Sequence, residues 1–313
     1  MGWREQSLGI KEKLPRTLNS ITDTFLHCQN LQELSLCRCV MEVDDEYLSK
    51  LFRNNQNLSS LTLCRYESIG KCFTYLPLDK IEQIHLHYCT VDVQFIKPIM
   101  KNALKLHTLA IQVGLGCSSQ FNQLEFSPVV PLKILELNLE DQIGPNLTSA
   151  ICRLENLTSL SLRGTALNDA QLNKIVLGCA KLVRLNLGRN DDLTDMIFQS
   201  INSLSKLKVL SLTAMNNLTD AEIQKLFNNL RKLDVSLTNF SASAILSVIK
   251  NLQCLELLMV CCCKQLKTCF VKSAIDIVKQ RDNKIPLKIE AFGTYIDVGQ
   301  VEDMSSLVKA ISR

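Results

Sequence analysis

Apolar residues recur along the chain in a phrase of nine positions, with Leu, Ile or Val at positions 1, 4 and 6 and, in most copies, a small or polar residue at position 9. Copies begin at Leu31, Leu58, Ile81, Leu106, Leu132, Leu157, Leu182, Leu207, Leu230 and Leu252. Successive copies start 22 to 27 residues apart. Because apolar and variable residues alternate from position 3 to position 7, the phrase predicts a short strand that buries one face.

The segments between several of these strands have a helical pattern. DAQLNKIVLGC, TDMIFQSINSL, TDAEIQKLFNNL and SASAILSVIKNL place apolar residues three and four positions apart, which predicts amphipathic helices. Asn168, Thr194, Thr219 and Ser241 stand where N-caps are expected. Two other segments, ESIGKCFTYLPLDK and GLGCSSQFNQLEFSPVVPLK, contain Gly, Pro and Ser, and we expect extended chain there.

One strand and one helix cannot close a core by themselves, but stacked copies bury a continuous one. The period lies within the range of roughly 20 to 29 residues found in leucine-rich repeats. The sequence therefore predicts an α/β fold, a leucine-rich-repeat solenoid in the form of a horseshoe arc. Its parallel sheet would line the concave face and its helices the convex face.

Position 9 turns the chain out of the strand with its side chain inward. A small hydrogen-bonding group there can satisfy loop backbone that would otherwise be buried without a partner. Five residues at this position suit the role: Cys39, Cys89, Thr165, Asn190 and Thr238. Four others do not, so we expect irregular loops at Tyr66, Glu140, Met215 and Val260.

The pattern weakens toward both ends of the chain, as terminal repeats require. We divide the chain into an N-terminal flank with a partial capping repeat (1–27), an array of about ten repeats (28–283), and a C-terminal half repeat with a capping helix (284–313). A helix is expected near Phe270 to Arg281 and a last strand at Leu287 and Ile289. The final capping helix would bury Val301, Met304, Leu307, Val308 and Ile311.

Composition narrows the functional class. The chain has 53 Leu among 313 residues and is 46% hydrophobic, which excludes a disordered protein. Lys and Arg number 35 against 31 Asp and Glu, too even a balance to predict nucleic-acid binding. No apolar run approaches the roughly 18 residues that would span a membrane. The first residues lack the pattern of a secretory signal, so we expect a cytoplasmic or nuclear protein whose 14 Cys are reduced.

Some repeats are more specific than a general leucine-rich repeat. CQNLQELSLCRC, GCAKLVRLNLGRNDDLTDMIFQSI and MNNLTDAEIQKLF share a Cys ahead of the first Leu (Cys28, Cys179), Cys or Asn after the strand, or an LTD helix entry. These features resemble the cysteine-containing repeats of F-box/leucine-rich-repeat proteins, the substrate receptors of cullin-type ubiquitin ligases. The resemblance implies substrate recognition and a ligase adaptor as partner. No F-box is recognisable, since some 27 residues before the first repeat cannot hold a three-helix module of about 40 residues.

The outward-facing strand positions predict a protein-binding concave face, because solenoids of this kind bind on such surfaces. A positive cluster is expected around Arg163 and Arg184, next to Lys232. The candidate partner-binding residues are Glu33, Ser35, His85, His87, Glu136, Asn138, Ser161, Arg163, Arg184, Asn186, Lys232, Asp234 and Glu256. For any single one of them, a solvated position on the sheet is the alternative.

Four residues could in principle do other chemistry. Cys37, Cys64 and His87 are predicted to fall in one lane of successive strands, with His85 two residues before His87. Two thiolates and two imidazoles suit zinc, and a Cys beside a His suits a nucleophile and its base. A flat lane does not converge on one metal ion, and no acid is placed to orient either His. We therefore predict no metal site, no cofactor and no enzymatic activity.

The leading hypothesis is a protein-binding solenoid that recognises substrates for cullin-type, ubiquitin-dependent degradation. The alternative is a stand-alone inhibitor or scaffold without a ubiquitin-ligase link. Neither hypothesis involves nucleic acid or a membrane.

Overall fold

The computed structural model describes Leu26 and residues 28–37, 44–67, 69–113, 119–226, 229–297 and, by their backbone, 308–311. The chain divides into two compact units, Met1–Leu157 and Thr158–Arg313. The predicted N-terminal flank and partial capping repeat (1–27) lie outside the described residues, except for Leu26.

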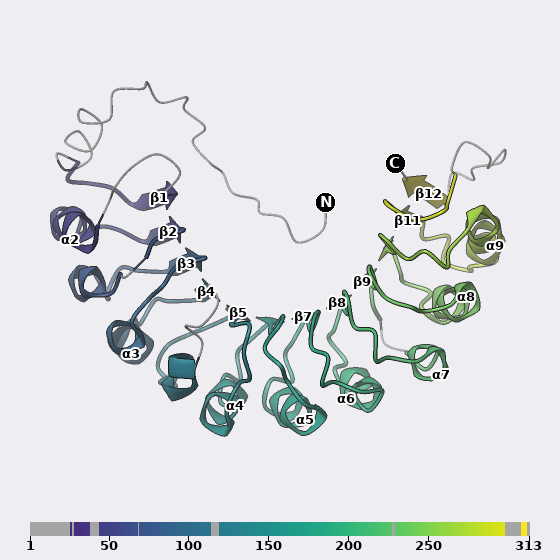
Figure 1. Cartoon of the computed structure of the whole chain (residues 1–313), viewed down its shortest axis with the longest axis horizontal. Coiled ribbons are helices and arrows are strands. Elements are labelled where there is room, and N and C mark those ends of the chain that lie inside the picture. Colours follow the sequence, from purple (N-terminus) through teal and green to yellow (C-terminus); the bar gives the residue numbers. More distant parts are fainter. Residues whose placement is uncertain are drawn as a thin grey trace. The chain divides into compact units, whose positions relative to one another are not determined.

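The first unit contains five parallel strands in chain order with helical segments between them. Its strands lie along one side and its helices along the other (Figure 1). The strands are β1 (Glu33–Cys37), β2 (Ser60–Cys64), β3 (Gln83–His87), β4 (Thr108–Gln112) and β5 (Ile134–Asn138). The helices are α2 (Asp45–Asn54), α3 (Val93–Asn102) and α4 (Pro145–Cys152), with 3₁₀ turns η1 (Lys71–Tyr75) and η2 (Ser119–Gln123).

The second unit follows the same plan with shorter strands. Its strands are β6 (Ser159–Ser161), β7 (Arg184–Asn186), β8 (Val209–Ser211), β9 (Lys232–Asp234), β10 (Leu257–Met259), β11 (Leu287–Glu290) and β12 (Val308–Ile311), all parallel to their neighbours. Its helices are α5 (Asp169–Gly178), α6 (Ile197–Asn202), α7 (Asp220–Ile223), α8 (Ala242–Asn251) and α9 (Thr268–Lys279).

The predicted fold class, an α/β leucine-rich-repeat solenoid, is confirmed. Positions 1, 4 and 6 of the phrase form the core of each unit, as Leu182, Leu185 and Leu187 illustrate with no exposed surface. Corresponding residues of successive strands are paired, for example Leu160 with Leu185 and Leu185 with Leu210. Fully burying one such side chain contributes about 1.5 to 3 kcal/mol, so the repeated phrase is the main source of stability.

Helix starts agree in part with the prediction. Asn168 caps α5 in a reciprocal box with Gln171, and Ser241 caps α8 through the amide of Ala244. Thr194 is not an N-cap, because α6 begins only at Ile197. The two segments expected to be extended instead each contain a 3₁₀ turn, η1 and η2.

The tenth copy of the phrase is displaced from its predicted position. Strand pairing aligns Leu258 with Leu233, and Leu233 is position 4 of the copy that begins at Leu230. Leu258 is therefore position 4 of the tenth copy, which begins at Leu255 and not at Leu252. Position 9 is then Cys263, not Val260. The segment LQCLELLMV allows both alignments because Leu252 and Leu255 are three residues apart and both are buried. The pairing of Leu258 with Ile289 likewise places a further copy from Pro286.

In eight copies of the phrase position 8 has a left-handed backbone, which the sequence pattern did not reveal; Val113 and Leu139 are not among them. Arg65, Tyr88, Gly164, Arg189, Ala214, Leu237, Cys262 and Gly293 have φ between 54° and 71°. This conformation costs a residue other than Gly about 1 to 2 kcal/mol. The turn is kept because it aims the position 8 amide at the next repeat: Arg189 N donates to Thr213 O at 2.9 Å and Cys262 N to Phe292 O at 2.7 Å.

Position 9 closes the same turn from within, as predicted. The side chain of Asn190 is fully buried, and its Nδ2 donates to Leu162 O and Leu187 O, each at 2.7 Å. Its Oδ1 accepts from the amides of Thr165 at 3.2 Å and Leu167 at 3.0 Å. One side chain therefore satisfies four backbone groups in two repeats.

Cysteine performs part of this role in other repeats. Cys89 Sγ donates to Leu63 O at 3.5 Å, and Cys263 Sγ donates to Val235 O at 3.3 Å. Both acceptors are position 6 carbonyls of the preceding repeat, like the Leu162 O that Asn190 binds. Burial raises the pKa of both thiols, which keeps the S–H donor in place. Of the other residues expected to fit, Cys39 lies outside the described residues.

A second set of bonds between repeats runs along the helix starts of the second unit. Asp169 accepts from the amide and hydroxyl of Thr194 at 3.0 and 2.7 Å. Asp195 binds Thr219 in the same way, at 2.8 and 2.6 Å. In these two pairs of successive repeats, the Thr of an LTD motif therefore donates to an Asp of the preceding repeat.

Two features near the C-terminus differ from the prediction. Residues 308–311, assigned to a capping helix, form β12 beside β11, while the rest of that segment lies outside the described residues. Arg281, expected at a helix end, lies beyond α9 and is 1% exposed. Its guanidinium donates to the carbonyls of Ile249, Leu252, Leu255 and Ile285. The expected strand at Leu287 and Ile289 is confirmed as β11.

We predict that Asn190→Ala lowers the free energy of unfolding by about 3 kcal/mol or more, because it leaves several buried backbone groups without partners. Asn190→Thr should cost less, since Thr occupies position 9 in other repeats. The matched control is Asn251→Ala, which removes a single exposed bond to Gln224 O and should change stability by no more than about 0.5 kcal/mol. Urea unfolding measures all three; equal losses for Asn190→Ala and Asn251→Ala would contradict the role of position 9.

The buried thiols predict a loss of stability at alkaline pH. Because the folded pKa of Cys89 and Cys263 is raised, their contribution is complete below the ordinary cysteine pKa and is lost as pH rises through the raised value. The double variant Cys89→Thr/Cys263→Thr keeps a donor that does not titrate. Its melting temperature should therefore fall less between about pH 8 and 10 than that of the wild type. Cys262→Ser, at an exposed position, is the control and should keep the wild-type pH dependence.

Candidate functional site

The outward-facing residues of the strands form what we call the strand face of each unit. They occupy positions 3, 5 and 7 of the phrase, and the pairing of the strands aligns equal positions into rows. Neighbouring members of a row are about 4.8 Å apart, so a row presents side chains to one ligand at regular spacing.

The first unit has five-residue strands and keeps all three rows within its sheet. Glu33 and Ser35 of β1 are exposed, and Asn138 of β5 is half-buried. The predicted lane of Cys37, Cys64 and His87 is confirmed, because Cys37 pairs with Cys64 and Cys64 with His87. These side chains stand one per strand along the position 7 row.

Two histidines and a glutamate form the titratable part of this face. The rings of His85 and His87 stack at 6.1 Å between centroids with an angle of 22° between their planes. In the position 5 row, Ala110 lies between His85 and Glu136. Burial lowers the pKa of His85, and the neighbouring His87 lowers it further. Burial raises the pKa of Glu136, against an opposing effect of His87. The sheet therefore couples the three groups electrostatically.

The candidate zinc ligands do not converge. Among the residues that the structure describes, no three His, Cys, Asp or Glu side chains are grouped closely enough to hold one metal ion. Cys37 and Cys64 follow the strand spacing in one row, and the ring of His85 stacks on that of His87.

Shorter strands give the second unit a different strand face. Asn186 and Asp234, both candidates for partner binding, are 8% exposed. Asn186 Oδ1 accepts from the amide of Gly188 at 3.1 Å, and Asp234 Oδ1 from the amide of Ser236 at 2.9 Å. Short polar side chains that bind the backbone two residues on are typical of turns. The position 5 row of this unit therefore stabilises the strand ends.

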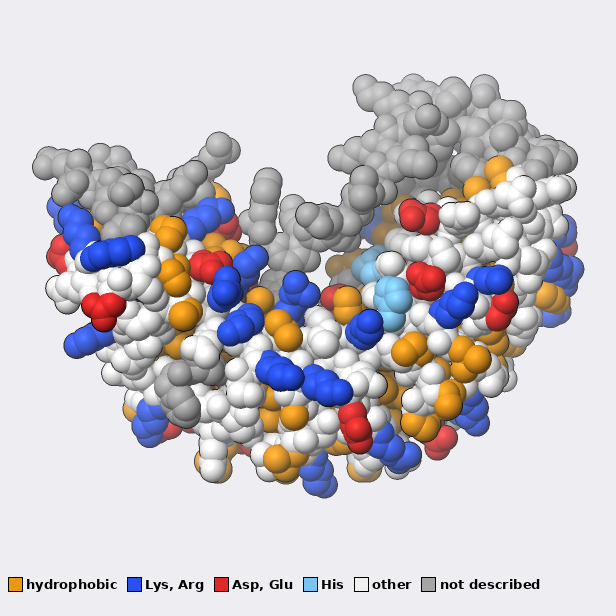
Figure 2. All heavy atoms as spheres, turned by 180° about the vertical axis from the view of Figure 1, so that it is seen from behind, with side chains coloured by type: hydrophobic (Ala, Val, Ile, Leu, Met, Phe, Trp, Pro, Cys, Tyr) orange, Lys and Arg blue, Asp and Glu red, His pale blue; other side chains and the backbone are white. Residues whose placement is uncertain are grey.

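The predicted positive cluster is rearranged. Arg184 and Lys232 are both at position 3 and exposed, with Val209 between them. Arg163 is at position 7, two residues beyond the half-buried Ser161 at position 5. Positions 3 and 7 are roughly 13 Å apart along a strand, so Arg163 and Arg184 are at opposite edges of the face. Figure 2 shows Lys and Arg side chains gathered over the middle of the view, with few Asp or Glu among them.

Glu256 was assigned to the strand face and lies outside it, because its copy of the phrase begins at Leu255. It occupies position 2, and Arg231 is the equivalent residue of the preceding repeat. The two form an ion pair, with Arg231 Nη1 2.9 Å from Glu256 Oε1. Position 2 was not considered as a binding position in the sequence, although Lys208 and Arg231 both occupy it.

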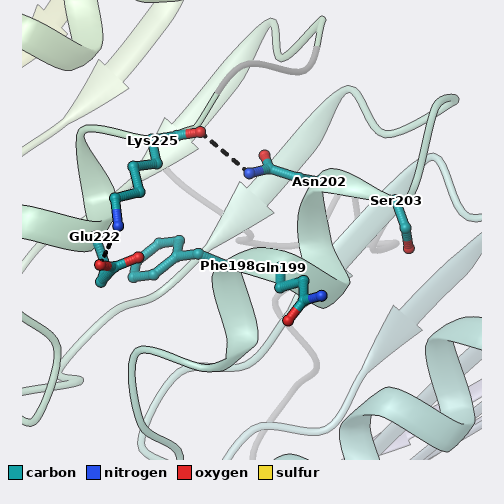
Figure 3. A pocket seen from close by; sticks show the side chains of 6 residues that line it. All are labelled: Phe198, Gln199, Asn202, Ser203, Glu222 and Lys225. Atoms are coloured by element: carbon teal, nitrogen blue, oxygen red, sulfur yellow. Dashed lines mark hydrogen bonds and ion pairs between the residues drawn. The ribbon is translucent and has the colours of Figure 1, made fainter.

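The helix side of the second unit has a shallow groove between α6 and α7 (Figure 3). Phe198, Gln199, Asn202, Ser203, Glu222 and Lys225 line it, and its volume is about 380 Å³. An ion pair between Lys225 and Glu222 forms one wall, and Asn202 donates to Lys225 O at 3.1 Å. Phe198 is 1% exposed, so its ring contributes little surface to the groove. Glu222 and Lys225 are paired with each other, and Ser203 Oγ donates to Ser200 O at 2.7 Å.

No helix in the described part of the chain has the length and apolar character needed to cross a bilayer.

Comparison with known proteins supports the fold. No model of a protein family matches the chain. A 142-residue segment, 44% of the chain, is 38% identical to the "Putative adenylate cyclase regulatory protein" of Trypanosoma equiperdum. That segment spans about a fifth of the relative, 21% of its length. Among solved structures, Rad7 in its complex with Elc1 from yeast matches 93% of this chain and 78% of the solved chain, with a TM-score of 0.52 and 20% identity. This likeness is one of fold, in agreement with the repeat solenoid described above.

The coupling of His85, His87 and Glu136 is testable by substitution. In His87→Gln we expect the pKa of His85 to rise toward its ordinary value and the pKa of Glu136 to rise further. The reason is that a positive charge at position 87 disfavours the charged form of His85 and favours the charged form of Glu136. Nuclear magnetic resonance titration of the His85 ring and the Glu136 carboxyl measures both. His107→Gln, another histidine of the first unit, is the control and should leave both values unchanged. If the His85 pKa does not move in His87→Gln, the two rings are not coupled.

Proposed function

We propose that this protein is a non-enzymatic binding solenoid that recognises protein partners through its strand faces. The observation that carries the proposal is the regular presentation of unlike side chains in rows. The first unit offers His85, His87, Glu136 and the exposed Glu33, and the second offers Arg184 and Lys232. Rows of this kind bind by shape and charge complementarity to an extended surface.

The cellular role that we propose is substrate recognition in cullin-type, ubiquitin-dependent degradation, in the cytoplasm or nucleus. Its support is the resemblance to cysteine-containing repeats of F-box/leucine-rich-repeat proteins. The hydrogen bonds that Cys89 and Cys263 make at position 9 give those cysteines a structural reason to recur. The likeness to Rad7, a protein solved in complex with Elc1, is consistent with a solenoid that works within an assembly.

A second candidate is a stand-alone inhibitor or scaffold without a ubiquitin-ligase link. The observation in its favour is the segment that is 38% identical to a protein named for the regulation of adenylate cyclase. Such a protein would use the same strand faces but would bind and hold its partner instead of presenting it for modification.

The two functions differ in whether the chain binds a ligase adaptor. We predict that the purified full chain forms a stable complex with a purified cullin-type adaptor, either Elc1 or the adaptor that binds F-boxes, detectable by co-elution in size-exclusion chromatography. Expressed with an affinity tag in cells, it should also capture a cullin. A chain that binds neither adaptor and captures no cullin, but forms a stoichiometric complex with another protein, would contradict the ligase role and favour the scaffold.

A further inference from the structure

Three consecutive turns at the start of strands in the second unit each contribute two cations. They are the turns that lead into β7, β8 and β9, and their basic residues are Lys181 and Arg184, Lys206 and Lys208, and Arg231 and Lys232. We call these six residues the basic strip. They occupy position 2, position 3 and the residue before position 1 of their repeats.

Equal positions of these repeats lie side by side, so the strip is a small grid of three repeats by three positions. Six of the nine places hold a cation, and the other three are Val183, Val209 and Asn229. No Asp or Glu occupies any of them. The repeat before the grid is uncharged at the same places, with Asn156, Thr158 and Ser159. The repeat after it supplies Glu256, which ends the strip.

The strip has little internal neutralisation. Arg184, Lys206, Lys208 and Lys232 make no ion pair with any described residue, and all but Lys208 are exposed. Among the acidic residues of these repeats, Asp191 and Asp192 follow β7 at the other end of the strand, and Asp234 within β9 is 8% exposed and accepts from the amide of Ser236. Like charges on adjacent strands repel each other, so an anion bound to the strip would offset the repulsion among its cations.

The geometry favours carboxylates as the anion. The backbone amides at positions 2 and 3 of the grid are already used, because Lys208 N and Val209 N both donate to Val183 O, and Arg231 N and Lys232 N to Lys208 O. These two positions therefore offer no nest of free amides to hold a phosphate, and an anion there must be bound by the side chains. One carboxylate is already bound there: Glu256 is 2.9 Å from Arg231.

The size and composition of the strip argue against nucleic acid. Three strands by four residues cover an area of roughly 10 Å by 13 Å. This area is much smaller than the protein surface that a duplex-binding module buries. None of the nine places holds an aromatic residue on which a base of a single strand could stack. An extended peptide advances roughly 3.3 to 3.6 Å per residue, so about four residues cross the strip.

We propose that the basic strip binds an extended acidic segment of a protein partner, with carboxylates at alternate residues, since alternate side chains of an extended segment face the same way. This proposal rests on the protein-binding function above and adds the chemistry of the partner. Binding places a row of Asp or Glu side chains over Arg184, Lys208 and Lys232, extending the pattern of the Arg231–Glu256 pair. Charge-assisted bonds to Arg are the strongest of these contacts.

The test uses the full chain and a fluorescent peptide of alternating Glu and Ser, followed by anisotropy, with a Gln and Ser peptide and poly(U) RNA as comparison probes. The strip variant is Arg184→Glu/Lys208→Glu. The control is Lys174→Glu/Lys272→Glu, which changes net charge equally at exposed helix positions of the same unit. We expect the acidic peptide to bind the wild type and the control alike, and to bind the strip variant at least about tenfold more weakly. Circular dichroism checks folding, and Arg184→Gln/Lys208→Gln provides a milder second variant that should also bind more weakly.

Three results would overturn the proposal. They are absence of peptide binding up to about 1 mM, equal weakening in strip and control variants, and tighter strip-dependent binding of poly(U) than of the acidic peptide. Adaptor binding is measured separately, so the two proposals fail independently. If the adaptor complex forms but the strip variant binds the peptide normally, only the strip proposal is lost. If the peptide binds through the strip but no adaptor does, the ligase role is lost.

Discussion

The structure depends on how each repeat satisfies its backbone where the strand ends. At that turn the amide of position 8 donates to the next repeat, and in most copies it does so from a left-handed backbone, even where the sequence offers Arg189 or Leu237. In three copies the side chain of position 9, which is Asn190, Cys89 or Cys263, also binds a carbonyl of the preceding repeat. A buried backbone group without a hydrogen-bond partner costs more free energy than a residue in a left-handed conformation. The turn therefore keeps its hydrogen bonds and accepts a positive φ. Each repeat is thus held by its neighbours on both sides.

This requirement also determines which side chains remain available for recognition. In the second unit, Asn186 and Asp234 bind the amides two residues ahead, and the strands of β6 to β10 are three residues long. In the first unit, position 5 holds residues such as Thr62, His85 and Glu136, and the strands are five residues long. The same phrase therefore yields two strand faces. One keeps titratable side chains in the middle of the sheet, and the other leaves its charged residues at the start of the strands.

Much of the fold could be predicted from sequence because the constraint is periodic. Leu at positions 1, 4 and 6 gives strand, register and core, and a hydrogen-bonding residue at position 9 was recognisable at Asn190. The prediction failed where local sequence allowed two solutions or where only tertiary contacts decide. LQCLELLMV offers two alignments three residues apart, and strand pairing selects Leu255. Nothing in the order of residues distinguishes Arg281, bound by four carbonyls, from an exposed arginine at a helix end.

The candidate site was harder to predict than the fold, for a physical reason. Reading positions 3, 5 and 7 as equally available assumes that an outward side chain faces only solvent or a partner. In the second unit a position 5 side chain instead faces its own turn, which removes Asn186 and Asp234 from the surface that a ligand can use. Position 2 lies before the strand, and its side chain does not face the turn. Lys208 and Arg231 can therefore extend from position 2 beside the position 3 row. The recognition that we propose for this unit is therefore displaced toward the strand starts by the same backbone requirement that holds the repeats together.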